Sequence, residues 1–411
     1  MIKSKILILG AGQGQVPLVK FAKENNYYVI VVSPEGDYPA FKYADKCIYL
    51  NLLDKEGVLN VANEENINAI ATDQTDISVG VVEYVAEKLN LPHVKSKSVE
   101  NFRDKSRMRD ICKQFGIKTI PYCVTESIEE AISFWNENKN FKVIIKPIDS
   151  QGSRGIETAT TLDEIEFAYN NAKKYSFSKK IIIEQFIEGE EIEVDTVVNN
   201  DRIIATLIGD VYNFTSENCF SAYERIYPTT KTEEIKQKIN LVNQQTLKAL
   251  GVITGWTHGE YIVTSDGDVY LLEVGLRGGG NYIGSDIIKE MLGVATHEMA
   301  FYTAIGNNSF YDKIHLKDST CAYKCFYIPE GEIISVDIDK SFLVQDCIIR
   351  HNLEHIDNIR YSSKNTDKTS RFTIVVKSDN QLDLKKLLED IPTHIDIKVK
   401  TDNGIGNIIW K

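Results

Sequence analysis

Short apolar runs alternate with amphipathic stretches along residues 1–95. Runs rich in β-branched residues predict buried strands, and apolar residues at helical spacing predict the helices between them. Strands that are apolar on both faces and alternate with helices are typical of a doubly wound parallel sheet, so this segment is predicted to be an α/β domain. The expected strands are residues 5–10, 27–33, 46–50 and 68–72, and the expected helices are 16–25, 55–66 and 77–90.

Residues 96–305 follow a different pattern, in which strands come in hairpins and helices flank them. Segments 127–138 and 161–175 open with Ser or Thr followed by acids, as helix N-termini do. This pattern predicts an α+β domain of two lobes, with the smaller lobe at about 125–190, and a small C-terminal α+β domain at 306–411. The expected strands in these domains are 142–147, 179–186, 191–198, 202–209, 267–275, 321–328, 333–337 and 371–377, and a helix is expected at 382–389.

The composition argues against several classes of protein. With 411 residues, of which 43% are hydrophobic and 26% charged, the chain can bury a large core. A net charge of -12 argues against a nucleic-acid partner. No apolar stretch approaches the roughly 20 residues of a membrane span, and the start of the chain lacks the features of a signal peptide. The seven cysteines are scattered without a Cys-x-x-Cys pair, which indicates reduced thiols and a cytoplasmic protein.

The first predicted strand runs into GAGQGQ, which is similar to a dinucleotide-binding turn. The spacing of Gly10, Gly12 and Gly14 does not fit, because Gln15 stands where the third glycine of that motif belongs. Ser33 also replaces the acidic residue that binds a ribose after the second strand. A nicotinamide-dependent oxidoreductase is therefore a weak alternative. A strand-to-helix turn or a wall of a substrate pocket explains these glycines better.

A lysine and a glycine-rich loop form the first candidate phosphate site. The apolar strand at 142–147 delivers Lys146, and the loop after it contains Gly152 and Gly155. Their missing side chains let backbone N–H groups wrap around phosphate oxygens, and Arg154 adds a positive charge. An ordinary flexible loop is the plainer alternative, but a lysine directly before it favours phosphate binding.

A connector that is first apolar and then acidic follows the strand at 179–186. Residues 184–187 run into a turn of acids at 188–191. Apolar walls with a hydrogen-bonding edge suit an adenine ring. An edge strand with a charged turn is the plainer alternative.

Two glutamates are predicted to face each other across a hairpin. The turn at 265–268 joins strands that carry Glu260 and Glu273, and both residues lie at equal distances from the centre of that turn. Adjacent carboxylates repel unless a cation lies between them, and Mg²⁺ prefers oxygen ligands and bridges carboxylates to nucleotide phosphates. Arg277 follows in a glycine-rich loop, where a guanidinium can bind a phosphate or carboxylate bidentately. A surface hairpin with exposed acids is the plainer alternative.

In this order the segments resemble the ATP-grasp superfamily, in the carboxylate–amine ligase branch that includes amino-acid ligases and is similar to the carbamoyl-phosphate synthase large subunit. The resemblance covers about residues 1–300 and makes residues 1–95 similar to the pre-grasp domain of the family. It implies ATP and Mg²⁺ (or Mn²⁺), and a reaction that activates a small carboxylate as an acyl phosphate and joins it to an amine. By position, the resemblance assigns ATP-binding roles to three groups of residues. The α- and β-phosphates are assigned to Lys105, which opens an amphipathic helix, and Lys146, and the loop that closes over the phosphates is assigned to Gln151, Gly152, Ser153, Arg154 and Gly155. The adenine is assigned to Glu184, Gln185, Phe186 and Ile187, and the ribose to Glu191.

The resemblance also assigns the metal and the catalytic groups. Glu260 and Glu273 are assigned to the metal, and Arg277, with Lys146 and Arg154, to catalysis at the transferred phosphate.

One position departs from the family pattern. The family usually has Glu-x-Asn-x-Arg at its metal site, whereas this chain has Gly275 where the asparagine belongs. Gly275 supplies no ligand to a second Mg²⁺, so either Glu273 bridges both ions or Asn281 reaches in from the loop. The missing ligand is also the best argument for a second alternative, a nucleotide-binding module without catalysis. The expected partners are a small carboxylate and an amine, without nucleic acid or membrane, and a homodimer is the expected assembly.

Overall fold

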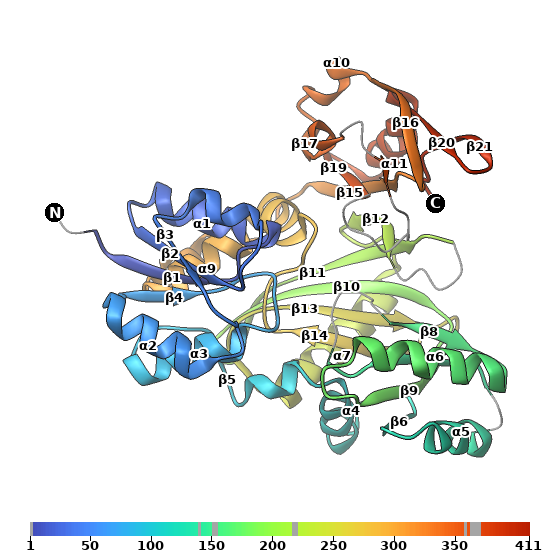
Figure 1. The fold of residues 1–411 in the computed structure, drawn as a ribbon, viewed down its shortest axis with the longest axis horizontal. Helices are drawn as coiled ribbons and strands as arrows, with labels where there is room; N and C mark the ends of the chain where they lie inside the picture. Colours follow the sequence, from blue (N-terminus) through green and yellow to red (C-terminus); the bar gives the residue numbers. More distant parts are fainter. Residues whose placement is uncertain (1–2, 139–140, 150–154, 216–220, 357–359, 362–370) are drawn as a thin grey trace.

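The computed structural model describes residues 3–138, 141–149, 155–215, 221–356, 360–361 and 371–411 (Figure 1). The N-terminal strands are β1 (Lys5–Leu9), β2 (Tyr28–Ser33), β3 (Lys46–Tyr49) and β4 (Ala69–Ala71). They form one sheet in the order β3-β2-β1-β4, and every strand pair is parallel. The parallel sheet predicted for this part of the chain is confirmed.

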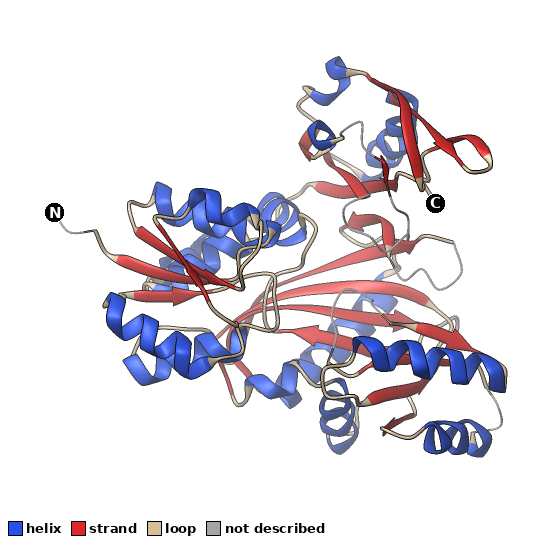
Figure 2. Ribbon diagram, viewed as in Figure 1, coloured by secondary structure: helices blue, strands red, loops and turns tan. Residues whose placement is uncertain are grey.

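Helices cover both faces of the parallel sheet (Figure 2). They are α1 (Val16–Glu24), α2 (Lys55–Glu65), α3 (Val79–Leu89) and, from a much later part of the chain, α9 (Thr296–Ala304). Ile8 shares a core with α1 and α9, whereas its neighbour Leu9 shares a core with α2 and α3. Successive side chains of a strand point to opposite faces, which produces these two layers. Phe21 of α1 packs edge-to-face on Phe301 of α9, with ring centroids 5.4 Å apart.

An antiparallel sheet with two helices forms a small lobe. Its elements are β6 (Tyr122–Thr125), α5 (Ile128–Glu137), β7 (Val143–Pro147), β8 (Glu157–Ala159), α6 (Leu162–Tyr175) and β9 (Ile181–Gln185). The strand order is β6-β9-β7-β8. Ser127 caps α5, and Thr161 forms a capping box with Glu164 at the start of α6. The helix starts predicted from these residues are therefore confirmed.

A long antiparallel sheet forms the centre of the molecule. Its first strands are β10 (Glu190–Asn199), β11 (Arg202–Asn213), β12 (Ala222–Tyr227), β13 (Val252–Val263) and β14 (Val269–Gly275), and the short β5 (Lys95–Ser96) pairs with β13. Their order is β14-β13-β10-β11-β12. Two helices, α4 (Lys105–Gln114) and α7 (Glu233–Leu250), pack on this sheet, where Met108 and Leu247 share a core with Val194 and Tyr261.

The large sheet continues directly into the C-terminal residues. β15 (Thr320–Tyr327) pairs with β12, and β19 (Arg371–Ser378) and β17 (Ile348–His351) extend the sheet further. The sheet therefore crosses the position near residue 305 at which the sequence pattern suggests a boundary. Cys321 and Cys325 share one face of β15, and Ala322 and Phe326 share the other. The remaining elements are α8 (Ile288–Leu292), β16 (Gly331–Ile338), α10 (Lys340–Leu343), β18 (Arg360–Tyr361), α11 (Gln381–Asp390), β20 (Ile395–Thr401) and β21 (Gly404–Asn407), with a second sheet in the order β18-β16-β20-β21.

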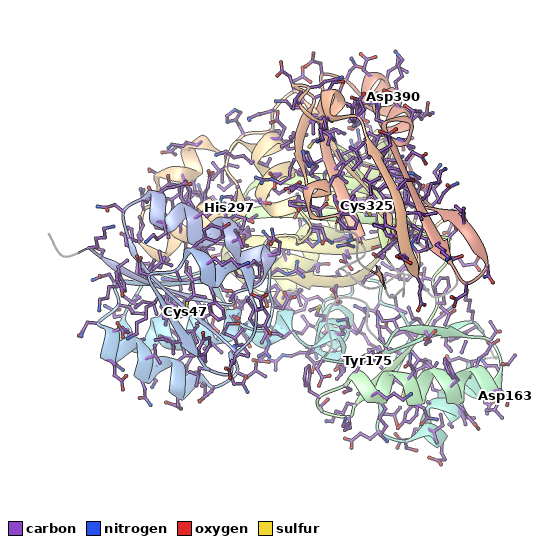
Figure 3. All side chains as sticks on the ribbon, turned by 45° about the horizontal axis from the view of Figure 1, so that its top comes forward. Cys47, Asp163, Tyr175, His297, Cys325 and Asp390 are labelled. Atoms are coloured by element: carbon purple, nitrogen blue, oxygen red, sulfur yellow. The ribbon has the colours of Figure 1, made fainter. Side chains whose placement is uncertain are left out.

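The cysteines of the described residues are all free thiols. Cys47 in the N-terminal unit and Cys325 in the large sheet lie far apart (Figure 3). Cys219 lies outside the described residues. None of the helices described by the structure has both the length and the apolar character needed to cross a bilayer.

Candidate active site

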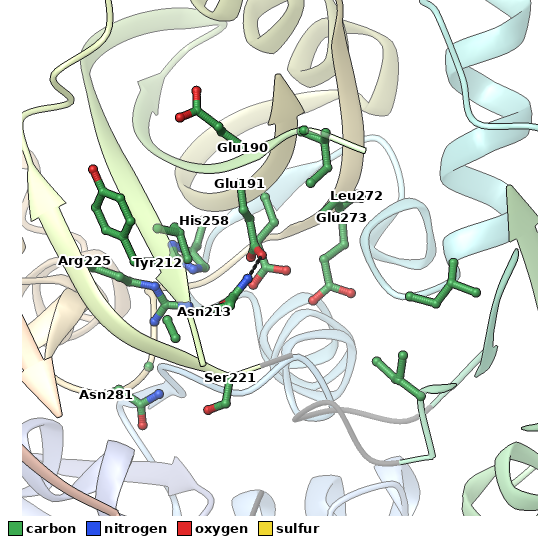
Figure 4. Close-up of a pocket in the computed structure, with 18 of the residues that line it drawn as sticks. Glu190, Glu191, Tyr212, Asn213, Ser221, Arg225, His258, Leu272, Glu273 and Asn281 are labelled. Carbon is green, nitrogen blue, oxygen red and sulfur yellow. Dashed lines mark hydrogen bonds between the residues drawn. The ribbon is translucent and has the colours of Figure 1, made fainter. Parts of the chain in front are cut away.

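A cleft of about 720 Å³ lies between the small lobe and the large sheet. Apolar side chains such as Ile144 and Leu272 line its end near the small lobe, and charged side chains line the part over the large sheet. Figure 4 shows Glu273, His258 and Arg225 in this charged part. A concave site with apolar walls and a few converging polar groups is the usual form of a small-molecule site.

Lys105 enters the cleft from the first turn of α4. The Asp104 carboxylate caps this helix by accepting hydrogen bonds from the backbone N–H groups of Ser106 (2.9 Å) and Arg107 (3.1 Å). Lys105 is thereby fixed as the first helical residue, as predicted, and its Nζ lies 2.7 Å from Glu273 Oε2. Burial opposes a positive charge on Lys105, but Glu273 keeps the pKa of this lysine above its usual value.

Lys146 enters the cleft near the end of β7 and contacts the Glu184 carboxylate. Arg109 of α4 contacts the same carboxylate, with 3.0 Å between its Nε and Glu184 Oε1. Burial opposes ionisation of Glu184, but Arg109 and Lys146 together lower its pKa to about 2. Arg109 also donates a hydrogen bond to the Leu272 carbonyl oxygen at 2.8 Å. One buried arginine, which the sequence pattern did not reveal, therefore links α4, the small lobe and β14.

The connector between β9 and β10 lines the apolar end of the cleft through Gln185, Phe186 and Ile187. Glu184 is the first residue assigned to the adenine, but its carboxylate already contacts two cations. The other three residues therefore offer the surface on which an adenine could pack. Glu191 lies further along on β10 and accepts a hydrogen bond from Asn213 Nδ2 at 2.6 Å (Figure 4). Burial raises the pKa of Glu191.

Glu260 and Glu273 pair directly across the β13–β14 hairpin, as the sequence predicts. Residues opposite each other on antiparallel strands have Cβ atoms about 5 Å apart. Lys105 lowers the pKa of Glu273 to about 2, whereas burial and the negative charge of Glu273 raise the pKa of Glu260 to about 8. Among the described residues, no lysine, arginine or histidine forms an ion pair with Glu260. Two adjacent carboxylates, one of them without a counter-charge, fit a divalent cation that prefers oxygen ligands, such as Mg²⁺.

The glycine at position 275 is explained by the residues that surround it. Arg277 donates two hydrogen bonds to Asp76 of the N-terminal unit, with Nε–Oδ1 of 3.0 Å and Nη2–Oδ2 of 3.1 Å. A Cβ atom on residue 275 would lie 2.6 Å from Asp76 Oδ1 and 2.9 Å from Arg277 Cζ. Any side chain at position 275 would displace this ion pair. The space that the family's asparagine would need is thus occupied by the Asp76 carboxylate, which comes from a distant segment of the chain. Asn281, the expected alternative ligand, accepts a hydrogen bond from Arg371 through its side-chain oxygen.

A buried cluster of charges lies next to the two paired glutamates. His258 Nδ1 lies 2.9 Å from Asp195 Oδ1, and its Nε2 lies 3.5 Å from Glu193 Oε1. Burial alone would lower the pKa of His258, but Asp195 and Glu193 raise it to about 10. Glu193, His258 and Glu260 are close enough together to hold a metal ion. However, an imidazolium offers no lone pair, and Arg225 Nε already lies 2.6 Å from Glu193. The sequence could not reveal this cluster, because its members have no motif.

Part of the predicted phosphate loop lies outside the described residues, namely Gln151, Gly152, Ser153 and Arg154. Gly155 is described and has a φ of 73°, a backbone conformation that favours glycine. A Cβ atom on residue 155 would also lie 2.7 Å from Cδ2 of Tyr175, which ends α6 (Figure 3). Backbone conformation and packing therefore both require a glycine where the loop rejoins the small lobe.

The glycine turn after β1 is filled by the side chain of Gln15. Its Oε1 accepts a hydrogen bond from the Gly12 N–H at 3.0 Å, and its Nε2 donates one to the Asp73 carbonyl at 2.7 Å. A Cβ atom on Gly10 would lie 3.0 Å from Gln15 Oε1. The turn thus connects the first strand to the segment after β4, and the occupied space argues against a dinucleotide at this position.

A cleft between a small antiparallel lobe and a long antiparallel sheet, preceded by a parallel α/β unit, agrees with the fold that the resemblance to ATP-grasp proteins implies. Comparison with known proteins finds similarity to ligases and a carboxylase. Residues 111–279 match the family model described as the D-ala D-ala ligase C-terminus. The chain is similar to the carbamoyl phosphate synthase large chain of Thermotoga petrophila, with 23% identity over 367 residues, which are 84% of this chain and 33% of the relative. It therefore spans about a third of the length of that relative.

Solved structures share the fold over nearly the whole chain. The L-amino acid ligase of Bacillus licheniformis superposes with a TM-score of 0.80 at 20% identity, covering 98% of this chain and 100% of that chain. The biotin carboxylase domain of 2-oxoglutarate carboxylase from Hydrogenobacter thermophilus superposes with a TM-score of 0.72 at 18% identity, covering 99% of this chain and 92% of that chain. At these identities the likeness establishes the fold.

Proposed function

We propose that this protein is an ATP- and Mg²⁺-dependent ligase that activates a small carboxylate as an acyl phosphate and couples it to an amine. The observation that carries the proposal is the meeting of Lys105 and Lys146 with the paired Glu260 and Glu273 in one cleft. Phosphoryl transfer depends mainly on positioning and on electrostatic stabilisation, and fixed charges in a cleft supply both. The matching D-alanine ligase family model and the amino-acid ligase fold support the same reaction class.

ATP would lie with its adenine against the apolar end of the cleft. Ile144, Ile187 and Leu272 would provide the walls, and Glu191 would bind the ribose hydroxyls. Lys105 and Lys146 would both contact the phosphates. Residues 151–154 lie outside the described residues, and the loop that they are expected to form would close over the phosphates. Exclusion of water by this loop protects a reactive acyl phosphate from hydrolysis.

Glu260 and Glu273 would hold Mg²⁺, which supplies positive charge to the phosphate oxygens when it is bound. The biotin carboxylase domain from Hydrogenobacter thermophilus was crystallised with MgADP. Lys105 contacts Glu273 in this structure and is placed to contact a phosphate once Glu273 binds a cation. The contact between Arg277 and Asp76 holds this guanidinium at the same site.

The reaction consists of two displacements. An oxygen of the substrate carboxylate attacks the γ-phosphorus of ATP, and ADP leaves, which gives the acyl phosphate. The nitrogen of the amine then attacks the acyl carbon, phosphate leaves, and the nitrogen loses a proton to form the amide. Arg277 is placed to stabilise the negative charge on the transferred phosphoryl group.

Hydroxylamine trapping tests this proposal. The protein, ATP and MgCl₂ are mixed with pooled carboxylic acids, including amino acids, and with hydroxylamine, which converts an acyl phosphate into a hydroxamate. We expect ATP-dependent hydroxamate with at least one pool, and none with Glu273→Gln. ATP consumption without hydroxamate from any pool would overturn the acyl-phosphate mechanism.

We infer the finer organisation from the same evidence. Residues 1–95 form the pre-grasp domain, 96–305 the ATP-grasp domain, and 306–411 a small C-terminal domain that shares the large sheet. A homodimer in the cytoplasm, with small molecules as the other partners, remains a prediction.

A further inference from the structure

The cations that line the cleft are matched by carboxylates, with one exception among the described residues. The pairs are Lys105–Glu273, Lys146–Glu184, Arg225–Glu193, Lys231–Glu190, His258–Asp195 and Arg277–Asp76. Arg371, the first residue of β19, also lines the cleft. In the described part of the chain, its contacts are with neutral oxygens alone.

Two side chains hold the Arg371 guanidinium in a defined orientation. Its Nη1 donates a hydrogen bond to Ser221 Oγ at 3.1 Å, and its Nη2 donates one to Asn281 Oδ1. Ser221 Oγ also lies 3.1 Å from the Tyr327 hydroxyl. Figure 4 shows Ser221 and Asn281 at the end of the pocket away from Glu190. The guanidinium is therefore oriented by hydrogen bonds that leave its charge in place.

Arg371 is a half-buried guanidinium that meets no carboxylate among the residues that the structure describes, and such a group can bind a planar anion. Arginine has N–H donors at three nitrogens, so donors remain on Arg371 after the two hydrogen bonds to neutral oxygens. A carboxylate matches these donors bidentately, and hydrogen bonds between two charged groups are about twice as strong as neutral ones. Side chains that are already oriented also lose less entropy when a ligand binds.

The position of Arg371 indicates which carboxylate it can take. Asn281 belongs to the loop that begins at Arg277, so Arg371 touches the segment that carries the arginine assigned to the transferred phosphate. In the proposed reaction, the carboxylate that becomes phosphorylated must lie at the γ-phosphate. Arg277 and the paired Glu260 and Glu273 are already assigned to the γ-phosphate, so Arg371 is left for a second carboxylate.

We propose that Arg371 binds a substrate carboxylate other than the one that is phosphorylated, held together with Ser221 and Asn281. This inference rests on the proposed ligase function. The carboxylate comes either from an amino acid that serves as the amine or from the second acid group of a dicarboxylate that is activated. The inference makes Arg371 a specificity-determining residue that lies outside the segments assigned from the sequence.

The test compares Arg371→Gln and Arg371→Lys with wild-type protein. Lys377→Gln is the matched control, because it removes a cation from the same strand at a position that does not line the cleft. ADP release is measured with the acid and amine found for the wild-type protein, and KM is determined separately for ATP, acid and amine. Each carboxylate-bearing substrate is also compared with its carboxamide analogue.

We expect Arg371→Gln to raise the KM of one substrate about 10- to 100-fold, because charged hydrogen bonds are lost. The KM of ATP should stay within about twofold, as for Lys377→Gln, and Arg371→Lys should restore part of the loss. Wild-type protein should prefer the carboxylate to its carboxamide, and Arg371→Gln should lose that preference. An effect on the amine identifies an amino acid as the ligand, and an effect on the acid identifies a dicarboxylate.

Two results would overturn the inference. The first is an Arg371→Gln protein with unchanged KM values for acid and amine. The second is a fall in kcat and in thermal stability with an unchanged carboxylate preference, which would make Arg371 a structural tie. If wild-type protein released no ADP with any acid and amine, the proposed function would fail as well, so the two failures are distinguishable.

Discussion

At the scale of single residues, Arg109 is the least expected component of the cleft. It is 1% exposed, and it contacts Glu184 and the Leu272 carbonyl. Its sequence context, RDKSRMRD, contains three arginines, and helical spacing alone does not tell which one is buried. Lys105 and Lys146 could be predicted because a helix start or a glycine-rich loop marks their positions. Arg109, Arg225 and Arg371 carry no such mark.

Replacement of Arg109 by alanine should destabilise the protein strongly. The substitution leaves a buried carboxylate with one cation fewer, and breaking a buried ion pair costs about 3–5 kcal/mol. Chemical denaturation would measure this loss. Lys113→Ala on the exposed face of the same helix is the control and should change the free energy of unfolding by less than about 0.5 kcal/mol. Equal stability of the two variants would contradict the assigned contacts of Arg109.

Glu83 of α3 should make stability depend on pH. Burial, with Glu87 and Glu100 nearby, raises its pKa to about 7 from the usual value of 4.5. The folded state therefore binds the proton of the Glu83 carboxyl group more tightly than the unfolded state does. Protonation of Glu83 stabilises the fold at low pH, and this contribution to the free energy of unfolding is lost as the pH rises from about 4.5 through 7. Thermal unfolding should show that Glu83→Gln gains stability relative to wild type between about pH 5 and pH 8.

The exposed Glu64 provides the comparison for this measurement. Glu64→Gln should follow the wild-type stability across the same pH range. A difference between Glu83→Gln and wild type that stays constant with pH would contradict the raised pKa of Glu83.

At the scale of elements, the β13–β14 hairpin shows what the sequence can predict. A turn with Asp-Gly between two apolar strands predicts the hairpin, and Glu260 lies opposite Glu273 as expected. The exact pairing also depends on a register shift between Glu260 and Tyr261, which the sequence does not reveal. β12 was not predicted, because its sequence AYERIY places Glu224 and Arg225 inside the sheet, where Lys324 and Glu193 neutralise them. Such pairing across strands far apart in sequence leaves no local pattern.

Substitution of Gly275, at the end of this hairpin, should lower activity while leaving the stability of the fold nearly unchanged. In Gly275→Ala the new Cβ atom would collide with the Asp76 and Arg277 side-chain ends, which can move without unfolding the protein. A displaced catalytic group lowers the rate by about tenfold to a hundredfold, so we expect ATP turnover to fall by that factor with little change in thermal stability. Gly406→Ala on β21, where a Cβ atom meets only ordinary contacts, is the control. Wild-type turnover by Gly275→Ala would show that the Asp76–Arg277 contact is dispensable.

At the scale of the whole molecule, three distant parts of the chain build one cleft. The N-terminal unit supplies Asp76, the central strands supply the paired glutamates, and β19 supplies Arg371. The parallel sheet, the hairpins and most helices could be predicted from periodicity and capping residues. The continuation of the large sheet into β15 and β19 and the packing of α9 on α1 could not, because they depend on contacts between segments far apart in sequence.

The central claim is that this cleft couples ATP to the joining of a carboxylate and an amine. The most direct measurement is ADP release from ATP and Mg²⁺ with pooled small acids and amino acids, for wild-type protein and for Glu273→Gln. We predict that one combination of acid and amine stimulates ADP release by wild-type protein, and that the variant, although folded, shows no stimulation. ATP binding without stimulation by any combination, or a variant as active as wild type, would contradict the claim.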